Sequence, residues 1–156
     1  MTNVIDLPAE YKKEAIEKLN DLLSAVQMFY MNVRGYHWNV KGPNFFILHQ
    51  KFEELYEFLN ETADALAERV QMLGGVPLHS FTDYGKLSAI KEDTNKTDGK
   101  TTVQGVLNGL AVLLKKERDI AAVAAEEGDE ATIDLVTGLI SKQEKDAWMY
   151  SSFLES

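Results

Sequence analysis

One long apolar stripe constrains this chain more than any other feature of its sequence. Between residues 45 and 73, apolar side chains recur at steps of three and four, which places them on one side of a single helix: Phe45, Leu48, Phe52, Leu55, Leu59, Ala63, Leu66, Val70 and Leu73. Gly74-Gly75-Val76-Pro77 ends this helix, because glycine suits a left-handed cap and proline cannot continue a helix. The pattern therefore predicts one long amphipathic helix.

Side chains that can bind metal lie beside this stripe. Four are on the same helix and a fifth precedes it, across the Gly42-Pro43 break: His49, Glu53, Asp64, Glu68 and His37. Fifteen residues separate His49 from Asp64. That spacing is roughly 22 Å along a straight helix at ~1.5 Å per residue, so these two side chains cannot bind one ion.

This spacing divides the ligands into two pairs. Asp64 and Glu68, at i and i+4, share one face of the helix. His37 and His49 form an imidazole pair, provided that the chain folds back at Gly42-Pro43. If both pairs belong to one site, a second copy of the chain must supply one of them, across a two-fold axis that sets the two helices antiparallel. The sequence thus predicts a site between subunits.

Another long helix precedes the stripe, and a long connection follows it. Pro8 suits a first helical turn, and apolar residues then recur to about His37: Ala15, Leu19, Leu22, Val26, Phe29 and Val33. Residues 76–100 are rich in turn formers. Within them, Asp83–Ile90 indicates a short helix and Lys91–Lys100 a polar surface loop.

Two more helices complete the pattern. Thr101 and Gln104 match a capping box that opens a helix running to about Glu127. Gly128 is its expected C-cap, and Asp129 the N-cap of the last helix. The side chains expected to face inward are Val103, Leu107, Leu110, Leu114 and Ala121, followed by Ile133, Val136, Ile140, Ala147, Tyr150 and Leu154. The prediction is a single all-α domain, residues 1–156, built as a ferritin-like four-helix bundle with a short extra helix in its long crossover.

Composition limits the function classes. The chain has no Cys, which excludes disulfides and thiolate metal sites and suits a reducing compartment. Neither a signal-peptide pattern nor an apolar run of membrane-spanning length is present, so we expect a soluble cytoplasmic protein without a membrane partner. Asp and Glu outnumber Lys and Arg by 25 to 16, and the net charge of −9 repels nucleic acid and attracts cations.

The Dps mini-ferritins, the DNA-binding proteins from starved cells, are the family that this sequence resembles. Their signature is similar to the segment YHWNVKGPNFFILHQKFEELYEFLNETADALAERVQMLGGVP, and a weaker likeness continues to EKDAWMYSSFL. The resemblance implies a hollow dodecamer, a homo-oligomer that oxidises ferrous iron with hydrogen peroxide, or with dioxygen, and stores the ferric product. Such an iron-storage ferroxidase limits oxidative stress. Association with the nucleoid is a further location that the family name suggests.

The resemblance also implies roles for particular residues. His37 and His49 of one subunit, with Asp64 and Glu68 of its two-fold mate, correspond to the iron ligands and so to the catalytic residues. Glu53 corresponds to an acidic position that holds or bridges a second iron, and Trp38 to an aromatic residue that intercepts stray oxidising equivalents. An intrachain di-iron site typically uses Glu-x-x-His pairs, but no His here has Glu three positions before it.

Structural alternatives exist for most of these residues. Asp64 with Glu68 is typical of a solvated helix face, His37 can interact with the helix dipole, and His49 can be an interface histidine. Packing roles are the alternative for Trp38, Phe45 and Phe46, and His79 is expected at the surface.

Two groups of acids also have two interpretations each. One group is an acidic helix N-terminus or, as the family architecture implies, the lining of a three-fold iron pore: Glu126, Glu127, Asp129, Glu130 and Asp134. The other faces either the mineral cavity or solvent: Glu54, Glu57 and Glu61.

Three functions remain in competition. The histidine and carboxylate ligands suit iron, although zinc would also bind. Direct DNA contact is the rival function, but it is doubtful, because residues 1–11 contain no Lys or Arg and nothing basic follows Lys145. The third is a helical shell without activity.

Overall fold

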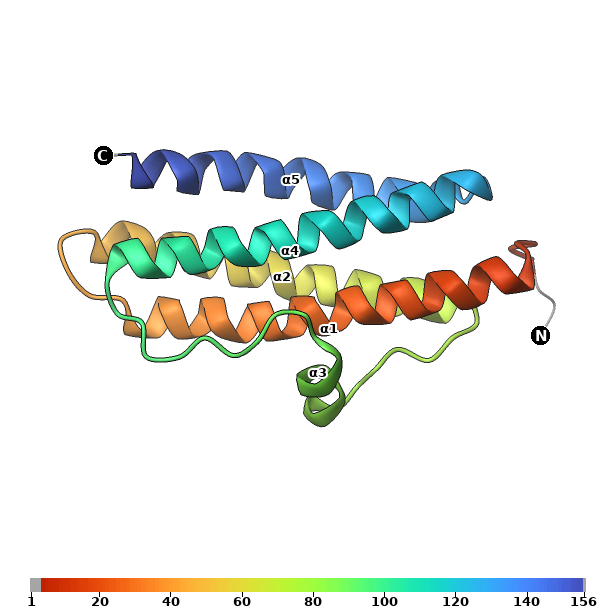
Figure 1. Cartoon of the computed structure of the whole chain (residues 1–156), viewed down its shortest axis with the longest axis horizontal. Coiled ribbons are helices and arrows are strands. Elements are labelled where there is room, and N and C mark those ends of the chain that lie inside the picture. Colours follow the sequence, from red (N-terminus) through yellow and green to blue (C-terminus); the bar gives the residue numbers. More distant parts are fainter. Residues whose placement is uncertain (1–3, 156) are drawn as a thin grey trace.

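The structure, a computed structural model, describes residues 4–155, which form four long α-helices, one short one and the segments that connect them (Figure 1). The long helices are α1 (Ala9–Asn39), α2 (Phe45–Met72), α4 (Gly99–Glu126) and α5 (Glu130–Leu154), and α3 (Phe81–Leu87) lies in the crossover. No strand occurs among these residues. The predicted all-α bundle with a short extra helix is therefore confirmed, and none of the described helices is long and apolar enough to cross a membrane.

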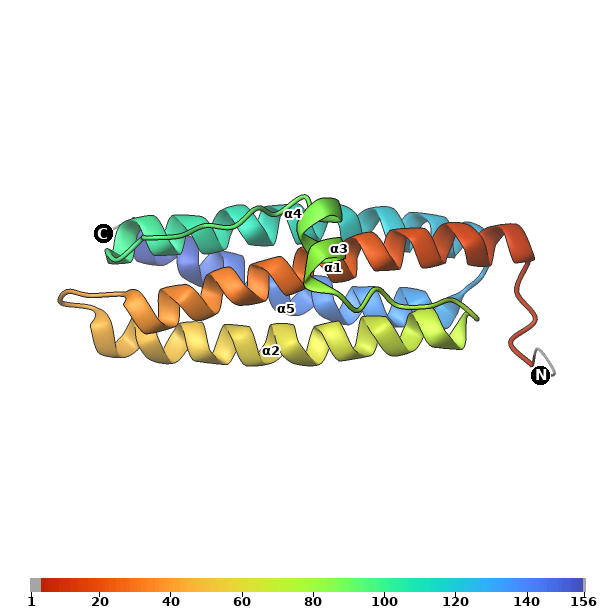
Figure 2. The same ribbon diagram turned by 90° about the horizontal axis from the view of Figure 1, so that it is seen from below.

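The connections set the two ends of the bundle. Short loops join α1 to α2 and α4 to α5, whereas the crossover runs back along the length of the bundle and carries α3 across α1 (Figures 1 and 2). One end therefore holds the α1–α2 loop, the start of α4 and the end of α5. The other end holds the start of α1, the end of α2 and the α4–α5 corner (Figure 1).

The core confirms the apolar stripes of α1 and α2. Every apolar position predicted for α1 is buried, and so is every one predicted for α2 except Phe45, which is half-buried at the start of the helix. Close contact between α1 and α4 requires glycine at position 109, because a Cβ atom there would overlap the Phe29 ring. Burial of these faces against one another provides most of the stabilisation of such helices.

The inward faces of α4 and α5 agree with the prediction in part, since Val103, Leu110, Val136 and Tyr150 are buried as predicted. Leu107, Leu114 and Ala121 are half-buried, and so are Ile133, Ile140, Ala147 and Leu154. The buried side chains include Val106, Leu113, Glu117, Ile120 and Ala124 in α4, and Thr132, Leu139, Gln143 and Asp146 in α5. Where adjacent residues such as Leu113-Leu114 are both apolar, the sequence does not show which one lies at the centre of the stripe, and one position corresponds to about 100° of rotation around the helix axis. The buried residues Glu117 and Gln143 are polar, so the apolar pattern did not include them in the inward face.

Two helix starts also differ from the prediction. The helix α4 begins at Gly99 because Asp98 is its N-cap and accepts the Thr101 N–H at 2.8 Å, while Gln104 bonds Asn108 instead of closing a capping box. The short helix α3 covers Phe81–Leu87 instead of Asp83–Ile90, because Ser80 caps it. Gly128, at φ +69°, and Asp129, the N-cap of α5, are as predicted.

Candidate metal centre

His37 and His49 meet at the end of the bundle that carries the α1–α2 loop. His37 lies in the last turn of α1 and is buried, and His49 is half-buried in the second turn of α2. Gly42 adopts φ +109° in the loop between them, a value that favours glycine, and the chain folds back there as expected. The two imidazole rings stack with centroids 3.8 Å apart and planes 13° apart.

Each of these imidazoles is held by the backbone carbonyl of the other residue. The Nδ1 atom of His37 lies 2.6 Å from the His49 carbonyl oxygen, and Nδ1 of His49 lies 2.8 Å from the His37 carbonyl oxygen. Because a carbonyl oxygen only accepts hydrogen bonds, both Nδ1 atoms must donate. Each neutral ring therefore keeps its Nε2 lone pair free, which is the tautomer that a metal ligand requires.

Asp64 and Glu68 lie on the exposed surface of α2, far from the histidines. They are one turn apart, and Asp64 borders a hollow between α1, α2 and α3. At ~1.5 Å per residue the helix sets Asp64 roughly 22 Å from His49. Accordingly, no group of three or more His, Cys, Asp or Glu side chains within residues 4–155 could hold a metal ion in one chain.

Glu53 and Tyr56 extend the face of α2 that carries His49. Glu53 is exposed and accepts a long hydrogen bond of 3.5 Å from the Tyr56 hydroxyl. The Tyr56 ring packs edge-on against His37, with centroids 5.3 Å apart. Desolvation and the Glu53 charge raise the pKa of Tyr56. Sequence analysis missed Tyr56, although its spacing of seven from His49 places both on one helix face.

Aromatic packing around the histidines differs from what was expected. Phe45 packs on His49, with ring centroids 5.0 Å apart, as the packing interpretation requires. Trp38 and Phe46 are instead 57% and 85% exposed, so they do not pack in the core of one chain. Phe46 lies one position off the buried stripe, and Trp38 follows the last buried turn of α1, where the Arg34 guanidinium lies 4.9 Å from its ring centroid.

The acidic corner between α4 and α5 divides into one buried and four exposed carboxylates. Asp129 is only 3% exposed, so it cannot line a pore, which corrects that part of the prediction. Its carboxylate binds Arg69 at 2.7 Å and the Tyr11 hydroxyl at 2.7 Å, and it accepts the Thr132 N–H as N-cap of α5. The exposed ones are Glu126, Glu127, Glu130 and Asp134.

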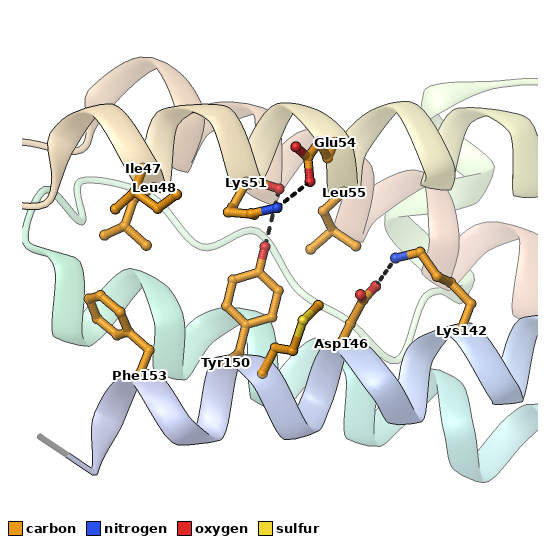
Figure 3. A pocket seen from close by; sticks show the side chains of 10 residues that line it. Ile47, Leu48, Lys51, Glu54, Leu55, Lys142, Asp146, Tyr150 and Phe153 are labelled. Atoms are coloured by element: carbon orange, nitrogen blue, oxygen red, sulfur yellow. Dashed lines mark hydrogen bonds and ion pairs between the residues drawn. The ribbon is translucent and has the colours of Figure 1, made fainter.

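Three acids and one histidine on the surface have simple surroundings. Glu54 is paired with Lys51 at 2.8 Å beside an apolar hollow between α2 and α5, which Tyr150 and Phe153 help to line (Figure 3). Glu57 and Glu61 are exposed on α2. His79 is exposed, as predicted, and its Nδ1 contacts the Pro77 carbonyl oxygen at 3.0 Å.

Comparison with known proteins shows the class of protein to which this chain belongs. The family model of the ferritin-like domain matches residues 16–156. A solved Dps protein from Vibrio cholerae O1, described as a member of the ferritin-like diiron-carboxylate superfamily, is 46% identical with a TM-score of 0.95, covering 98% of this chain and 96% of that one. A solved Dps protein from Bacillus brevis is 35% identical with a TM-score of 0.89, covering 93% of this chain and 97% of that one.

A curated relative has a name that agrees with these structures. The DNA protection during starvation protein of Porphyromonas gingivalis is 39% identical over 150 residues, which are 96% of this chain and 94% of that protein. This chain belongs to the Dps family of ferritin-like proteins, and its bundle is the ferritin-like one predicted from the sequence. At the level of the family, this membership indicates an iron-sequestering mini-ferritin.

Proposed function

We propose that this protein oxidises ferrous iron at sites shared by two copies of the chain. His37 and His49 of one copy and Asp64 and Glu68 of a second copy, antiparallel along α2, bind the iron. The observation that carries this proposal is the reciprocal pairing of the histidines, which holds both Nε2 lone pairs free. The two acids lie exposed on the same helix but roughly 22 Å away, so only another chain can supply them.

The proposed ligand atoms explain why iron would be bound and why its oxidation would be favoured. Imidazole nitrogen and carboxylate oxygen suit iron, and zinc binds the same ligands as a competitor without redox chemistry. The anionic carboxylates stabilise the ferric product more than the ferrous reactant, which favours oxidation. Glu53, one turn beyond His49, can hold a second and more loosely bound iron.

Hydrogen peroxide is the oxidant that we propose, with dioxygen as the alternative acceptor. Two ferrous ions each lose one electron, and peroxide with two protons becomes two molecules of water. This reaction removes both reagents that generate hydroxyl radical. The ferric product would then be stored inside a hollow dodecamer, to which Glu57 and Glu61 could present nucleating carboxylates. The exposed acids at the α4–α5 corner would line the path of iron into the shell.

Protection of DNA follows from this chemistry without direct contact. The net charge of −9 opposes binding to phosphates. We expect a gel-shift assay with duplex DNA to show no binding from low salt to physiological salt. Binding that weakens steeply as salt increases would instead support the direct-contact function.

The first test removes the imidazoles. A His37→Ala, His49→Ala double variant should oxidise ferrous iron with peroxide at least about 10-fold more slowly than the unaltered protein, as followed by absorbance of the ferric product under anaerobic conditions. His79→Ala removes an exposed histidine from another part of the surface and serves as the control. An unaltered rate in the double variant would contradict the proposal.

A second test asks whether the ligands come from two chains. An Asp64→Ala, Glu68→Ala variant and the double histidine variant should each be slow alone. In shells co-assembled from equal amounts of both, half of the pairs are mixed, and each mixed pair contains one intact site out of two. We therefore expect recovery of about a quarter of the unaltered rate, because of the two-fold symmetry. A site within one chain predicts no recovery.

A further inference from the structure

Two polar side chains face each other in the interior of the bundle, apart from the proposed metal centre. Glu117 of α4 and Gln143 of α5 are both 0% exposed. The Gln143 Nε2 atom donates to Glu117 Oε1 at 2.6 Å. Neither residue belongs to the iron ligands, and neither was singled out by the apolar pattern, so their burial requires its own explanation.

The unpaired atoms of this pair supply that explanation. Within residues 4–155, the buried side-chain polar atoms that lack a hydrogen-bond partner are Arg34 Nε, Glu117 Oε2 and Gln143 Oε1. Two of them belong to the same pair, and both are oxygens. An amide oxygen only accepts hydrogen bonds, and so does an ionised carboxylate. With Glu117 ionised, both oxygens would stay unsatisfied in the interior, which is unfavourable for each of them.

One proton satisfies both atoms. If Glu117 Oε2 carries a hydrogen, it becomes a donor, and Gln143 Oε1 is the unpaired acceptor on the facing side chain. Together with the existing bond from Gln143 Nε2, this closes a cyclic acid–amide pair between α4 and α5. Burial in the apolar interior also raises the pKa of Glu117 to about 8, against the weaker opposing effects of Gln143 and Arg118.

Among residues 4–155, the basic side chains near this pair are bound to other acids and do not take the role of the proton. On the helices around the pair, Arg118 binds Glu144, Lys116 binds Asp21 of α1, and Lys142 binds Asp146. The buried cation of α2, Arg69, is bound to Asp129. The side chains that α1 and α2 bury in the middle of the bundle are aliphatic or neutral, among them Leu22, Leu23, Val26, Leu59 and Thr62.

A metal ion is also a poor occupant of this position. The pair offers two oxygen atoms, whereas hard cations such as calcium take about six to eight oxygen ligands. No group of three or more metal-binding side chains exists in the described part of the chain. Of a basic side chain, a metal ion and a proton, the proton is therefore the occupant that fits this pair.

We propose that Glu117 and Gln143 form a buried proton-binding site in which the Glu117 carboxyl is uncharged at neutral pH and donates its hydrogen to Gln143 Oε1. The site couples α4 to α5. At alkaline pH the proton passes to bulk hydroxide, the two oxygens face each other unpaired, and the contact between the helices weakens.

The decisive variant is Glu117→Gln, which keeps the shape of the pair and supplies a permanent N–H donor in place of the acid. Unfolding of the assembled protein should be followed from pH 6 to pH 10 at one protein concentration. In the unaltered protein the folding equilibrium constant should fall up to about tenfold per pH unit between the unfolded and folded pKa values of this acid, because the folded state alone keeps the proton. The variant should lack this component. Glu144→Gln, which removes a nearby exposed carboxylate, should retain it.

An infrared measurement tests the protonation itself. At pH 6 the unaltered protein and Glu144→Gln should show the carbonyl band of a buried carboxylic acid, shifted in heavy water and absent from Glu117→Gln. The band should disappear only at alkaline pH, an observation that holds even if the variant does not fold. A carbonyl band that disappears already in the acidic range as the pH rises, together with the bands of the surface carboxylic acids, would overturn the proposal. An alkaline transition that moves when a chelator is added would overturn it as well, in favour of a metal ion.

Discussion

Replacement of Asp129 by Asn should destabilise the protein more than any other loss of a single acid at the α4–α5 corner. Asp129 caps α5 and binds Arg69 of α2 and Tyr11 of α1, so its carboxylate connects three helices at one end of the bundle (Figure 1). The side chains of Arg69 and Asp129 are only 8% and 2% exposed. Asparagine preserves the shape of the cap but leaves the Arg69 charge buried without its counter-ion.

The electrostatic surroundings of Asp129 give the size of the expected loss of stability. Burial alone would raise the pKa of Asp129, but hydrogen bonds from Thr132, Tyr11 and Arg69 outweigh it and lower the pKa from 3.8 to about 2. At ~1.4 kcal/mol per pKa unit, this shift contributes about 2.5 kcal/mol of stability at neutral pH. Because a broken buried pair also leaves a charge uncompensated, we expect Asp129→Asn to cost about 3–5 kcal/mol.

The contribution of Asp129 to stability should decrease as the pH falls. A lowered pKa means that the contribution of Asp129 is complete above about pH 4 and is lost as the pH falls toward 2. Urea unfolding at fixed protein concentration should therefore show a large difference between the unaltered protein and Asp129→Asn at pH 7, and a smaller one at pH 3.

Controls separate the ion pair from the general effect of acid removal. Asp134→Asn removes an exposed carboxylate from the same corner and should change stability by less than about 0.5 kcal/mol. Tyr11→Phe removes one hydrogen bond to Asp129 and should cost about 1 kcal/mol. Our reasoning would be refuted by an Asp129→Asn variant that matched Asp134→Asn at pH 7.

Two further predictions concern packing and oxidation. Gly109→Ala should destabilise the protein by about 1–3 kcal/mol, because the new methyl group overlaps the Phe29 ring; thermal unfolding measures this, and Gly138→Ala, where no atom lies within 4 Å, should not lose stability. Trp38→Phe should leave iron binding intact but shift peroxide damage to other residues, as mapped by mass spectrometry after iron oxidation. Trp148→Phe, also exposed, should keep the original damage pattern, and so would Trp38→Phe if Trp38 had no protective role.

The buried face of a helix was predictable where the apolar residues of the sequence fit only one side of it. The stripe of α2 has apolar residues at nearly every inward position, so its phase is unambiguous. In α4, both Leu113 and Leu114 are apolar, and the buried Glu117 breaks the stripe where it would have decided between them. A polar side chain that finds its partner 26 residues away, as Gln143 does with Glu117, cannot be recognised from periodicity.

Of the candidate site, the sequence could predict the meeting of the two histidines but not the contacts that orient them. Spacing alone separated the histidine pair from the acid pair, and the structure brings His37 and His49 together. Their tautomers depend on two backbone carbonyls that happen to face the rings after the chain reverses, and no sequence pattern encodes that contact. The meeting of Asp64 and Glu68 with these histidines depends on a second chain and stays a prediction.

The interior of the bundle explains why the proposed iron site has to lie between chains. Within residues 4–155 the buried carboxylates are Glu117, Asp129 and Asp146, and each is already bound to Gln143, Arg69 or Lys142. The buried imidazole, His37, is in the last turn of α1, and α1 finishes at the end of the bundle opposite the α4–α5 corner (Figure 1). One bundle therefore offers no place where an imidazole meets two free carboxylates. In the proposed arrangement, exposed acids on α2 of a second copy would meet that requirement without putting any unpaired charge inside the fold, where its desolvation would be costly.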